Sequence, residues 1–279
     1  MAAEGRPVGL LPFSVLGPMG RTVDDAYMLL QAQAGSDPHD PFSTAPVTDL
    51  DSPLEQADLG SIRAMITPDL GSAAMSHAYS SIFADRTSHF RHHFAAAIDA
   101  SPDFTDGDNC FEVLRGVNFV AAHGGRVRDH RDSLSPNVVD NVDRGLAYSL
   151  ADVAEAHLQQ SRIARAWLDL FEDIDVVICP AASSTPFPHD QWSVGEIDGE
   201  AMETYMRWLG ITYLPTMALA CGIALPCGLD QAGMPFGIQV LSAPGNDRLV
   251  AEVAKALESV LQCHDATRRP LPDLDSLRG

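Results

Sequence analysis

Apolar side chains recur at three- and four-residue spacing over several stretches of this chain, which is the pattern of amphipathic helices. We predict helices over residues 23–34, 78–98, 111–122, 136–170, 201–209 and the segment that follows Asp247. Thr22 is expected to cap the first helix with Asp25 reaching back to it, and Gly35 to end it in a left-handed conformation. The longest stretch is expected to break into two helices near Ser149.

Four shorter segments have the composition of β-strands. Residues 61–67 alternate apolar and polar side chains, and residues 175–179 form a compact apolar run that ends at Pro180. Residues 223–225 and 236–241 read as a hairpin-like pair joined by a turn over 230–235. Strands embedded among many helices predict an α/β fold with a mixed β-sheet layered with α-helices. No break in composition divides the chain, so residues 1–279 are expected to form a single domain.

The net charge and the apolar content of the chain make some classes of binding partner unfavourable. The formal net charge is −20 and the hydrophobic fraction is 46%. Such an acidic surface repels nucleic-acid phosphates and anionic lipid headgroups, so neither is an expected partner. The chain has no apolar run long enough to span a membrane, and its first residues lack the basic and apolar regions of a secretion signal. We therefore expect a cytoplasmic protein whose five cysteines, with no C-x-x-C pair, are reduced thiols.

Three segments resemble the amidase signature family. Residues 17–25 (GPMGRTVDD), followed by 34–37 (AGSD) and 40–41 (DP), are similar to the family's helix entry and the loop after it. Residues 174–180 resemble a family strand that ends in proline. Residues 226–228 (PCG) and 233–240 (GMPFGIQV) resemble the family's C-terminal hairpin. The order of these segments makes the resemblance specific, because they run across nearly the whole chain.

The resemblance implies the C-terminal portion of the amidase signature fold and an activity on the carbon–nitrogen bonds of linear amides. Family enzymes use a serine nucleophile, a second serine in a cis peptide and a lysine base, with no metal and no organic cofactor. The branch that acts on misacylated tRNA shares the same core. The sequence departs from the family where Leu219 and Cys221 stand at positions that usually carry a glycine and a proline.

The catalytic residues of the family have no counterpart here. The family draws its serines from a Gly-Gly-Ser-Ser stretch and its lysine from further upstream, but no Gly-Gly-Ser-Ser occurs in this chain. The only lysine, Lys255, falls at an ordinary solvent-facing position of the last predicted helix. An alcohol needs an adjacent base to act as a nucleophile. We therefore expect an incomplete, truncated amidase-like domain that is inactive alone.

Other serine, cysteine and histidine residues are weaker candidates for a catalytic nucleophile or a metal ligand. Ser183 and Ser184 form a serine pair in a proline-rich loop, and Cys179 ends an apolar strand as a buried thiol would. His89, His92 and His93 form an H-x-x-H-H run whose first and last members would share a helix face, but metal binding needs a third ligand. Residues 123–131 are expected to form a polar loop without ligand spacing. We assign no catalytic residue and no metal ligand.

Residues 180–189 and 213–217 are expected to line the substrate pocket, with Pro180, Thr216 and Met217 as its members. Three interpretations remain open: a truncated amidase that would bind a small-molecule amide if completed, a non-catalytic binding or interaction subunit completed by another chain, and an independent enzyme with cysteine or metal chemistry. The second would associate through an exposed sheet edge.

Overall fold

A computed structural model describes residues 13, 15–39 and 50–271 of the chain, and within them the main element is a five-stranded sheet. Its order is β2-β1-β3-β7-β6, and its strands are β1 (Arg63–Ile66), β2 (Ala96–Asp99), β3 (Val176–Pro180), β6 (Cys221–Leu229) and β7 (Pro235–Ser242). Strands β1, β2 and β3 are parallel, whereas β7 runs antiparallel to both β3 and β6. The expected α/β class with a mixed sheet is confirmed.

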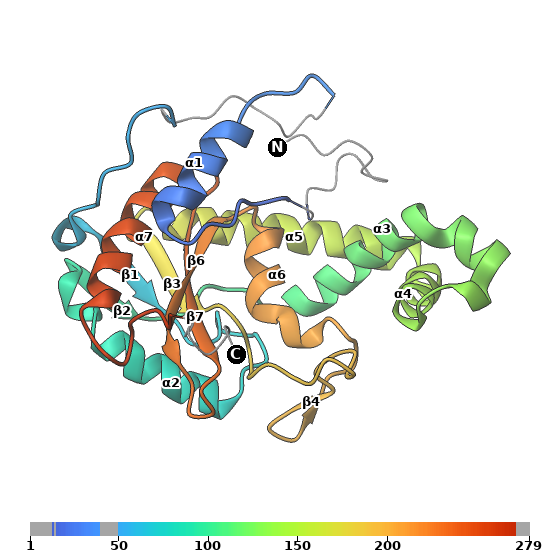
Figure 1. Cartoon of the computed structure of the whole chain (residues 1–279). Helices are drawn as coiled ribbons and strands as arrows, with labels where there is room; N and C mark the ends of the chain where they lie inside the picture. Colours follow the sequence, from blue (N-terminus) through green and yellow to red (C-terminus); the bar gives the residue numbers. More distant parts are fainter. Residues whose placement is uncertain (1–12, 14, 40–49, 272–279) are drawn as a thin grey trace.

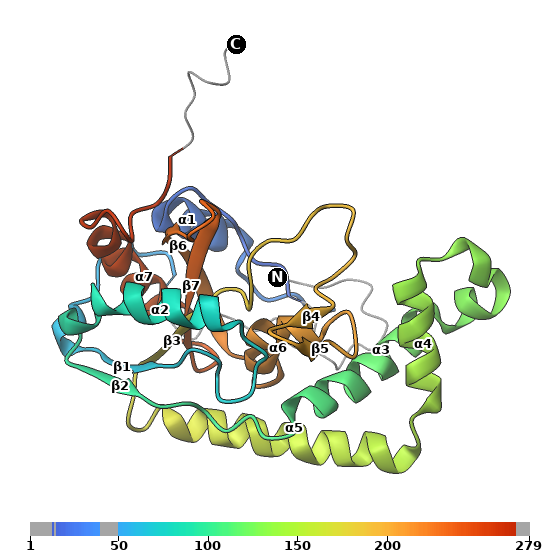
Figure 2. The ribbon, with the colours of Figure 1, turned by 90° about the horizontal axis from the view of Figure 1, so that it is seen from below.

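Helices cover both faces of this sheet (Figure 1). The helices are α1 (Val23–Gln33), α2 (His77–Ser88), α3 (Gly107–His130), α4 (Pro136–Ala147), α5 (Leu150–Leu170), α6 (Gly210–Met217) and α7 (Asp247–Gln262). Figure 2 shows α5 running beneath the sheet, with α3 and α4 extending away from it to one side. A small hairpin of β4 (Glu196–Ile197) and β5 (Glu200–Ala201) lies apart from the main sheet. No helix in the described part is long and apolar enough to cross a membrane.

The central strand β3 divides the interior into two hydrophobic clusters. All five of its residues are buried. Val176 and Ile178 point into a first cluster shared with α1, α2 and α7, while Val177 and Cys179 point into a second cluster shared with α3, α5 and α6. Successive side chains of a strand face opposite sides, so an uninterrupted apolar run is what a strand covered on both faces requires.

Side-chain caps begin α1 at Thr22 and α5 at Ser149. The Thr22 hydroxyl accepts a hydrogen bond from the Asp25 amide (3.1 Å). The break near Ser149 is confirmed, because Ser149 and Asp152 form a reciprocal capping box that begins α5. The expected left-handed cap at Gly35 is wrong: α1 ends at Gln33, Ala34 is extended, and Gly35 has φ 159°.

Three expected elements are wrong in extent or type. The helix predicted over residues 78–98 ends at Ser88, and residues 96–99 form strand β2, because pairing with β1 overrides the helical spacing. The loop predicted over 123–131 belongs almost entirely to α3, which continues to His130 while packing on α4. The helix predicted over 201–209 begins only at Gly210 as α6. Of the family-like segments, residues 40–41 lie outside the described residues.

The predicted β6–β7 hairpin is confirmed, and its turn depends on one carboxylate. Asp230 Oδ1 accepts hydrogen bonds from the amides of Ala232 (2.9 Å) and Met234 (2.8 Å). Two glycines near this turn have left-handed backbones, Gly228 with φ 84° and Gly233 with φ 79°. They differ in surroundings: a Cβ on Gly228 would lie 2.0 Å from the Ala266 carbonyl oxygen, whereas one on Gly233 would meet nothing within 4 Å.

We predict that Gly233→Ala costs about 1 kcal/mol of unfolding free energy, from backbone strain alone. Gly228→Ala adds a backbone collision, so its cost should reach about 3 kcal/mol. Urea denaturation of both variants beside the parent chain measures the difference. Equal losses for the two substitutions would show that the segment around Ala266 does not pack on the hairpin as described.

Candidate functional site

The candidate site is built where the carboxyl end of β3 meets helix α6. Carboxyl ends of neighbouring parallel strands share one edge of a sheet, and ligand sites of α/β proteins gather there. Gln239 on β7 joins the two elements: its Nε2 donates to the carbonyl of Pro180 (3.1 Å) and to the carbonyl of Ile211 (2.8 Å). This side chain therefore fixes the first turn of α6 against the end of β3.

The three residues expected to line a pocket lie on these two elements. Pro180 is buried at the end of β3. Met217 is 1% exposed and belongs to the second hydrophobic cluster. Thr216 is half-buried, and its hydroxyl donates to the Thr212 carbonyl one turn earlier (3.1 Å). The structure brings the residues into one region, and their role as pocket lining remains a prediction.

The loop after β3 contains the serine pair. Ser183 is fully buried, and its carbonyl accepts a hydrogen bond from the Ser76 amide at the start of α2 (2.9 Å). In the described residues the Ser183 hydroxyl has no hydrogen-bond partner. The Ser184 hydroxyl reaches only the neighbouring Thr185 carbonyl (3.4 Å). Neither serine contacts a base that would activate it as a nucleophile.

A second polar group at this edge follows β1. Thr67 is fully buried, its hydroxyl lies 2.8 Å from the Ser101 hydroxyl, and it accepts a hydrogen bond from the Leu70 amide (3.0 Å). This contact holds a turn in which Leu70 has φ 54° and Gly71 has φ 82°. Sequence reasoning missed Thr67 and Ser101. The sequence feature that indicated a turn at this place is Pro68, which directly follows the apolar strand.

Helix α6 is also fixed to α3 through buried polar contacts. Asp108 on α3 accepts a hydrogen bond from the Tyr213 hydroxyl and forms an ion pair with Arg207, and the Tyr213 ring stacks on Phe111 with 4.0 Å between ring centres. Burial raises the pKa of the Asp108 carboxyl, and hydrogen bonding to Tyr213 and the charge of Arg207 oppose that rise. Burial also raises the pKa of Tyr213. We interpret this group as an anchor for α6, and sequence reasoning missed Asp108 and Arg207 because they are ninety-nine positions apart along the chain.

The buried cysteines are held as neutral thiols. Cys179 is fully buried, and burial raises its pKa. Burial likewise raises the pKa of Cys110 to about 11 and those of Cys227 and the half-buried Cys221 to about 12. Because the thiolate is the nucleophile, these positions disfavour thiol catalysis, as expected for Cys179.

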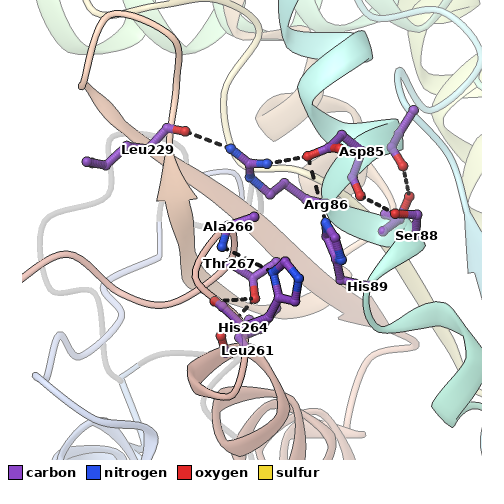
Figure 3. Close-up of polar contacts among 11 residues, drawn as sticks. Asp85, Arg86, Ser88, His89, Leu229, Leu261, His264, Ala266 and Thr267 are labelled. Carbon is purple, nitrogen blue, oxygen red and sulfur yellow. Dashed lines mark hydrogen bonds and ion pairs between the residues drawn. The ribbon is translucent and has the colours of Figure 1, made fainter.

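The histidine run does not form the helix face that its spacing predicts. Helix α2 ends at Ser88, so His89 caps it while His93 lies in the separate short helix Arg91–His93. Figure 3 shows His89 beside His264, with 3.8 Å between the stacked ring centres, and with Nε2 4.0 Å from the Asp85 carboxylate. Among residues 13, 15–39 and 50–271 no group of three or more His, Cys, Asp or Glu side chains gathers as metal ligands would.

Lys255 is half-buried instead of solvent-facing. Its Nζ donates to the Leu54 carbonyl (2.6 Å) and forms an ion pair with Asp24 of α1 (2.9 Å). This lysine therefore joins α7 to α1 and to the segment before β1. Both contacts give it a structural role.

Comparison with known proteins agrees with the resemblance in the sequence. Residues 127–251 match the family model "Amidase". The chain is 24% identical over 250 residues to an acylamidase of Rhodococcus erythropolis, and 27% identical over 278 residues to a Glutamyl-tRNA(Gln) amidotransferase subunit of Anaeromyxobacter sp. (strain K). Each match covers 88% of this chain. The structure of a bacterial aryl acylamidase of the amidase signature family superposes with a TM-score of 0.78 and 19% identity over 91% of the chain, which shows a shared fold.

The resemblance to the amidase signature family is therefore confirmed, and so is the expected fold class. The chain spans about half the length of the curated relatives it matches: 52% of the acylamidase and 54% of the amidotransferase polypeptide. It likewise covers 55% of the aryl acylamidase chain.

The departure at Leu219 has a structural consequence. Leu219 follows α6, has φ 57°, and is 41% exposed. Glycine adopts this left-handed conformation without the steric cost that a Cβ imposes, which accounts for the glycine expected here from the resemblance.

We predict that Leu219→Gly raises the free energy of unfolding by about 1 kcal/mol, because relief of backbone strain outweighs the loss of a partly exposed side chain. Leu219→Ala is the matched control: it removes the side chain but keeps the Cβ, so it should not stabilise. Thermal and urea unfolding of the three chains make the comparison. A glycine variant no more stable than the alanine variant would contradict it.

We also predict that Cys263, which is exposed, reacts rapidly with a thiol reagent in the native protein, whereas Cys179 reacts only on unfolding. Mass spectrometry of the labelled protein identifies the modified thiols. Fast modification of Cys179 under native conditions would contradict this prediction, because it would show a reactive thiol that could act as a nucleophile.

Proposed function

Because the chain matches the amidase family model and has the fold of amidase signature enzymes, we propose that it is the C-terminal part of an amide hydrolase of that family. The activity of such an enzyme is the hydrolysis of carbon–nitrogen bonds in linear amides by the Ser–cis-Ser–Lys mechanism. The observation that carries the proposal is the shared sheet of β1, β3, β7 and β6 with α6 fixed at its edge, together with the family-like hairpin at residues 226–240.

In this proposal the 279 residues do not hydrolyse amides by themselves. They contain no Gly-Gly-Ser-Ser stretch, and their single lysine is engaged by Leu54 and Asp24. The Ser183 hydroxyl has no partner in the described residues that would take its proton. A serine without a base, and without donors aimed at the developing oxyanion, cannot form an acyl-enzyme at a useful rate. The catalytic serines and lysine of a complete enzyme would lie outside this chain.

The part played by this chain would be to shape the pocket for the amide. Pro180 ends β3, and Thr216 and Met217 end α6, so these residues lie close together at the strand edge, with Pro180 and Met217 buried and Thr216 half-buried. Gln239 holds the two elements together through its contacts with the Pro180 and Ile211 carbonyls. The proposed ligand is a small-molecule amide, with no metal or organic cofactor, in the cytoplasm.

A second candidate function is a non-catalytic subunit that is completed by another chain. One relative, from Anaeromyxobacter sp. (strain K), is by its name one subunit of the Glutamyl-tRNA(Gln) amidotransferase. A sheet that ends in an unpaired strand favours association through its edge. The net charge of −20 makes direct contact between this chain and a nucleic acid unfavourable.

We predict that the purified chain hydrolyses neither an acyl anilide nor a primary carboxamide above the buffer rate, while full-length acylamidase of Rhodococcus erythropolis serves as the positive control. Turnover is followed by release of the amine. Hydrolysis that survives both Cys179→Ala and a metal chelator would contradict the proposal. Hydrolysis abolished by Cys179→Ala would support the independent thiol enzyme instead.

A further inference from the structure

Three elements meet around the stacked rings of His89 and His264 (Figure 3). Helix α2 ends there at His89, and the β6–β7 hairpin reaches the same place with Gly228 and Leu229. The third element is the turn of residues 264–267, which follows α7 and which we call the C-terminal turn. None of these residues belongs to the candidate site described above.

The C-terminal turn is seated closely on the hairpin. The Ala266 carbonyl oxygen lies where a Cβ on Gly228 would be only 2.0 Å away. Thr267 is 1% exposed, and its hydroxyl donates to the Leu261 carbonyl in the last turns of α7 (2.7 Å). The hairpin is in turn tied to α2, because Arg86 Nη2 donates to the Leu229 carbonyl (2.9 Å). The turn therefore closes a junction between α7, the hairpin and α2.

One hydrogen bond within the turn requires His264 to be neutral. The Ala266 amide donates to Nδ1 of His264 (3.1 Å). A backbone amide can only donate, so Nδ1 must carry a lone pair. A protonated imidazole has two N–H donors and no acceptor. His264 is exposed, so solvent can deliver a proton to its ring. Protonation at Nδ1 thus removes the acceptor on which the Ala266 amide depends.

The neighbouring ring of His89 adds a second reason. His89 is the C-terminal cap of α2, where the helix dipole favours a positive charge, and its Nε2 lies 4.0 Å from the Asp85 carboxylate. A protonated His89 is therefore stabilised where it stands. It would face a protonated His264 across 3.8 Å between ring centres, and two like charges so close repel each other.

The titratable and charged groups near the two rings come from all three elements: Asp85 and Arg86 on α2, Asp230 on the hairpin, and Cys263, Asp265 and Arg268 beside the turn. The carboxylates already have partners. Asp85 contacts Arg86 as well as His89, and Asp230 accepts the amides of its own turn. Asp265 forms an ion pair with Arg268 (3.1 Å). These carboxylates are therefore poorly placed to offset a proton on His264.

We propose that His264 is a pH-sensitive latch for the C-terminal turn. Neutral His264 holds the turn against the hairpin and α2, and protonation of its Nδ1 releases the turn. The released turn binds this proton more readily than the docked turn does, so docking is strongest at high pH and weakens as the pH falls. Histidine changes charge between about pH 8 and about pH 5, which sets the range of the response. The latch is independent of the proposed amide hydrolysis, which the activity assay tests separately.

The test is amide hydrogen exchange of the purified chain, resolved by residue with NMR and corrected for the intrinsic rate at each pH. From about pH 7.5 to about pH 5.5, the protection of the Ala266 amide should fall about tenfold, from one lost hydrogen bond and the added repulsion. The Val177 amide in β3 is the internal reference and should not change. Its protection in each variant also checks that the fold is retained.

Two variants separate the two causes. His264→Asn supplies an oxygen that can accept the same amide two residues on, and it cannot be protonated, so Ala266 should be protected equally at both pH values. His89→Phe keeps a stacked ring without a charge, so the fall should shrink to about threefold.

Three results would overturn the proposal. The first is a parent chain in which the protection of Ala266 follows that of Val177 at every pH. The second is a His264→Asn variant that loses protection in acid as the parent does, because another group would then control the turn. The third is a fall in His89→Phe as large as in the parent chain, which would remove the coupling between the two rings.

Discussion

The fold depends on the burial of β3 between two hydrophobic clusters. Because Val176 and Ile178 face one cluster while Val177 and Cys179 face the other, the strand links both sets of helices to one sheet, as its neighbours β1 and β7 also do through Met65 and Leu241. Its neighbours β1 and β7 take their positions by pairing with it, and β6 and β2 follow from these. An added charge in this strand would have to be buried without a partner, which costs several kcal/mol.

Arginine and aspartate contacts fix the elements around that strand. The Asp175 carboxylate, just before β3, accepts hydrogen bonds from the Arg63 amide (2.7 Å) and from its guanidinium, while the Asp175 amide donates back to the Arg63 carbonyl (2.9 Å). Partial burial alone would raise the pKa of the Asp175 carboxyl, but the Arg63 hydrogen bonds outweigh it, so the pKa is lowered. The stability from this contact is therefore present at neutral pH and is lost in acid, as the pH falls through the lowered pKa.

The sequence predicted the elements whose signals are local. The buried strand before Pro180, the helix break near Ser149 and the turn at Asp230 each depend on residues within a few positions, and all three are present. Strand β2 was missed because Ala96 and Ala97 carry no strand preference and are ordered by pairing with β1. The contacts that shape the candidate site were missed for the same reason: Gln239 with Ile211, Asp108 with Arg207, and Thr67 with Ser101 each join residues distant in sequence.

The described residues thus combine helices and strands packed around one sheet with a site that holds no activated nucleophile. This is consistent with a chain that shapes an amide pocket but depends on groups outside it for chemistry. The account requires that these residues fold as one unit around β3. The most direct measurement is urea unfolding followed separately at the two clusters. Protection of the Cys227 thiol from a thiol reagent reports on the first cluster. Trp167 fluorescence reports on the second cluster in a variant with the substitutions Trp192→Phe and Trp208→Phe. The account predicts coincident transitions with one midpoint. Two separated transitions would contradict it, because β3 would then not couple the clusters.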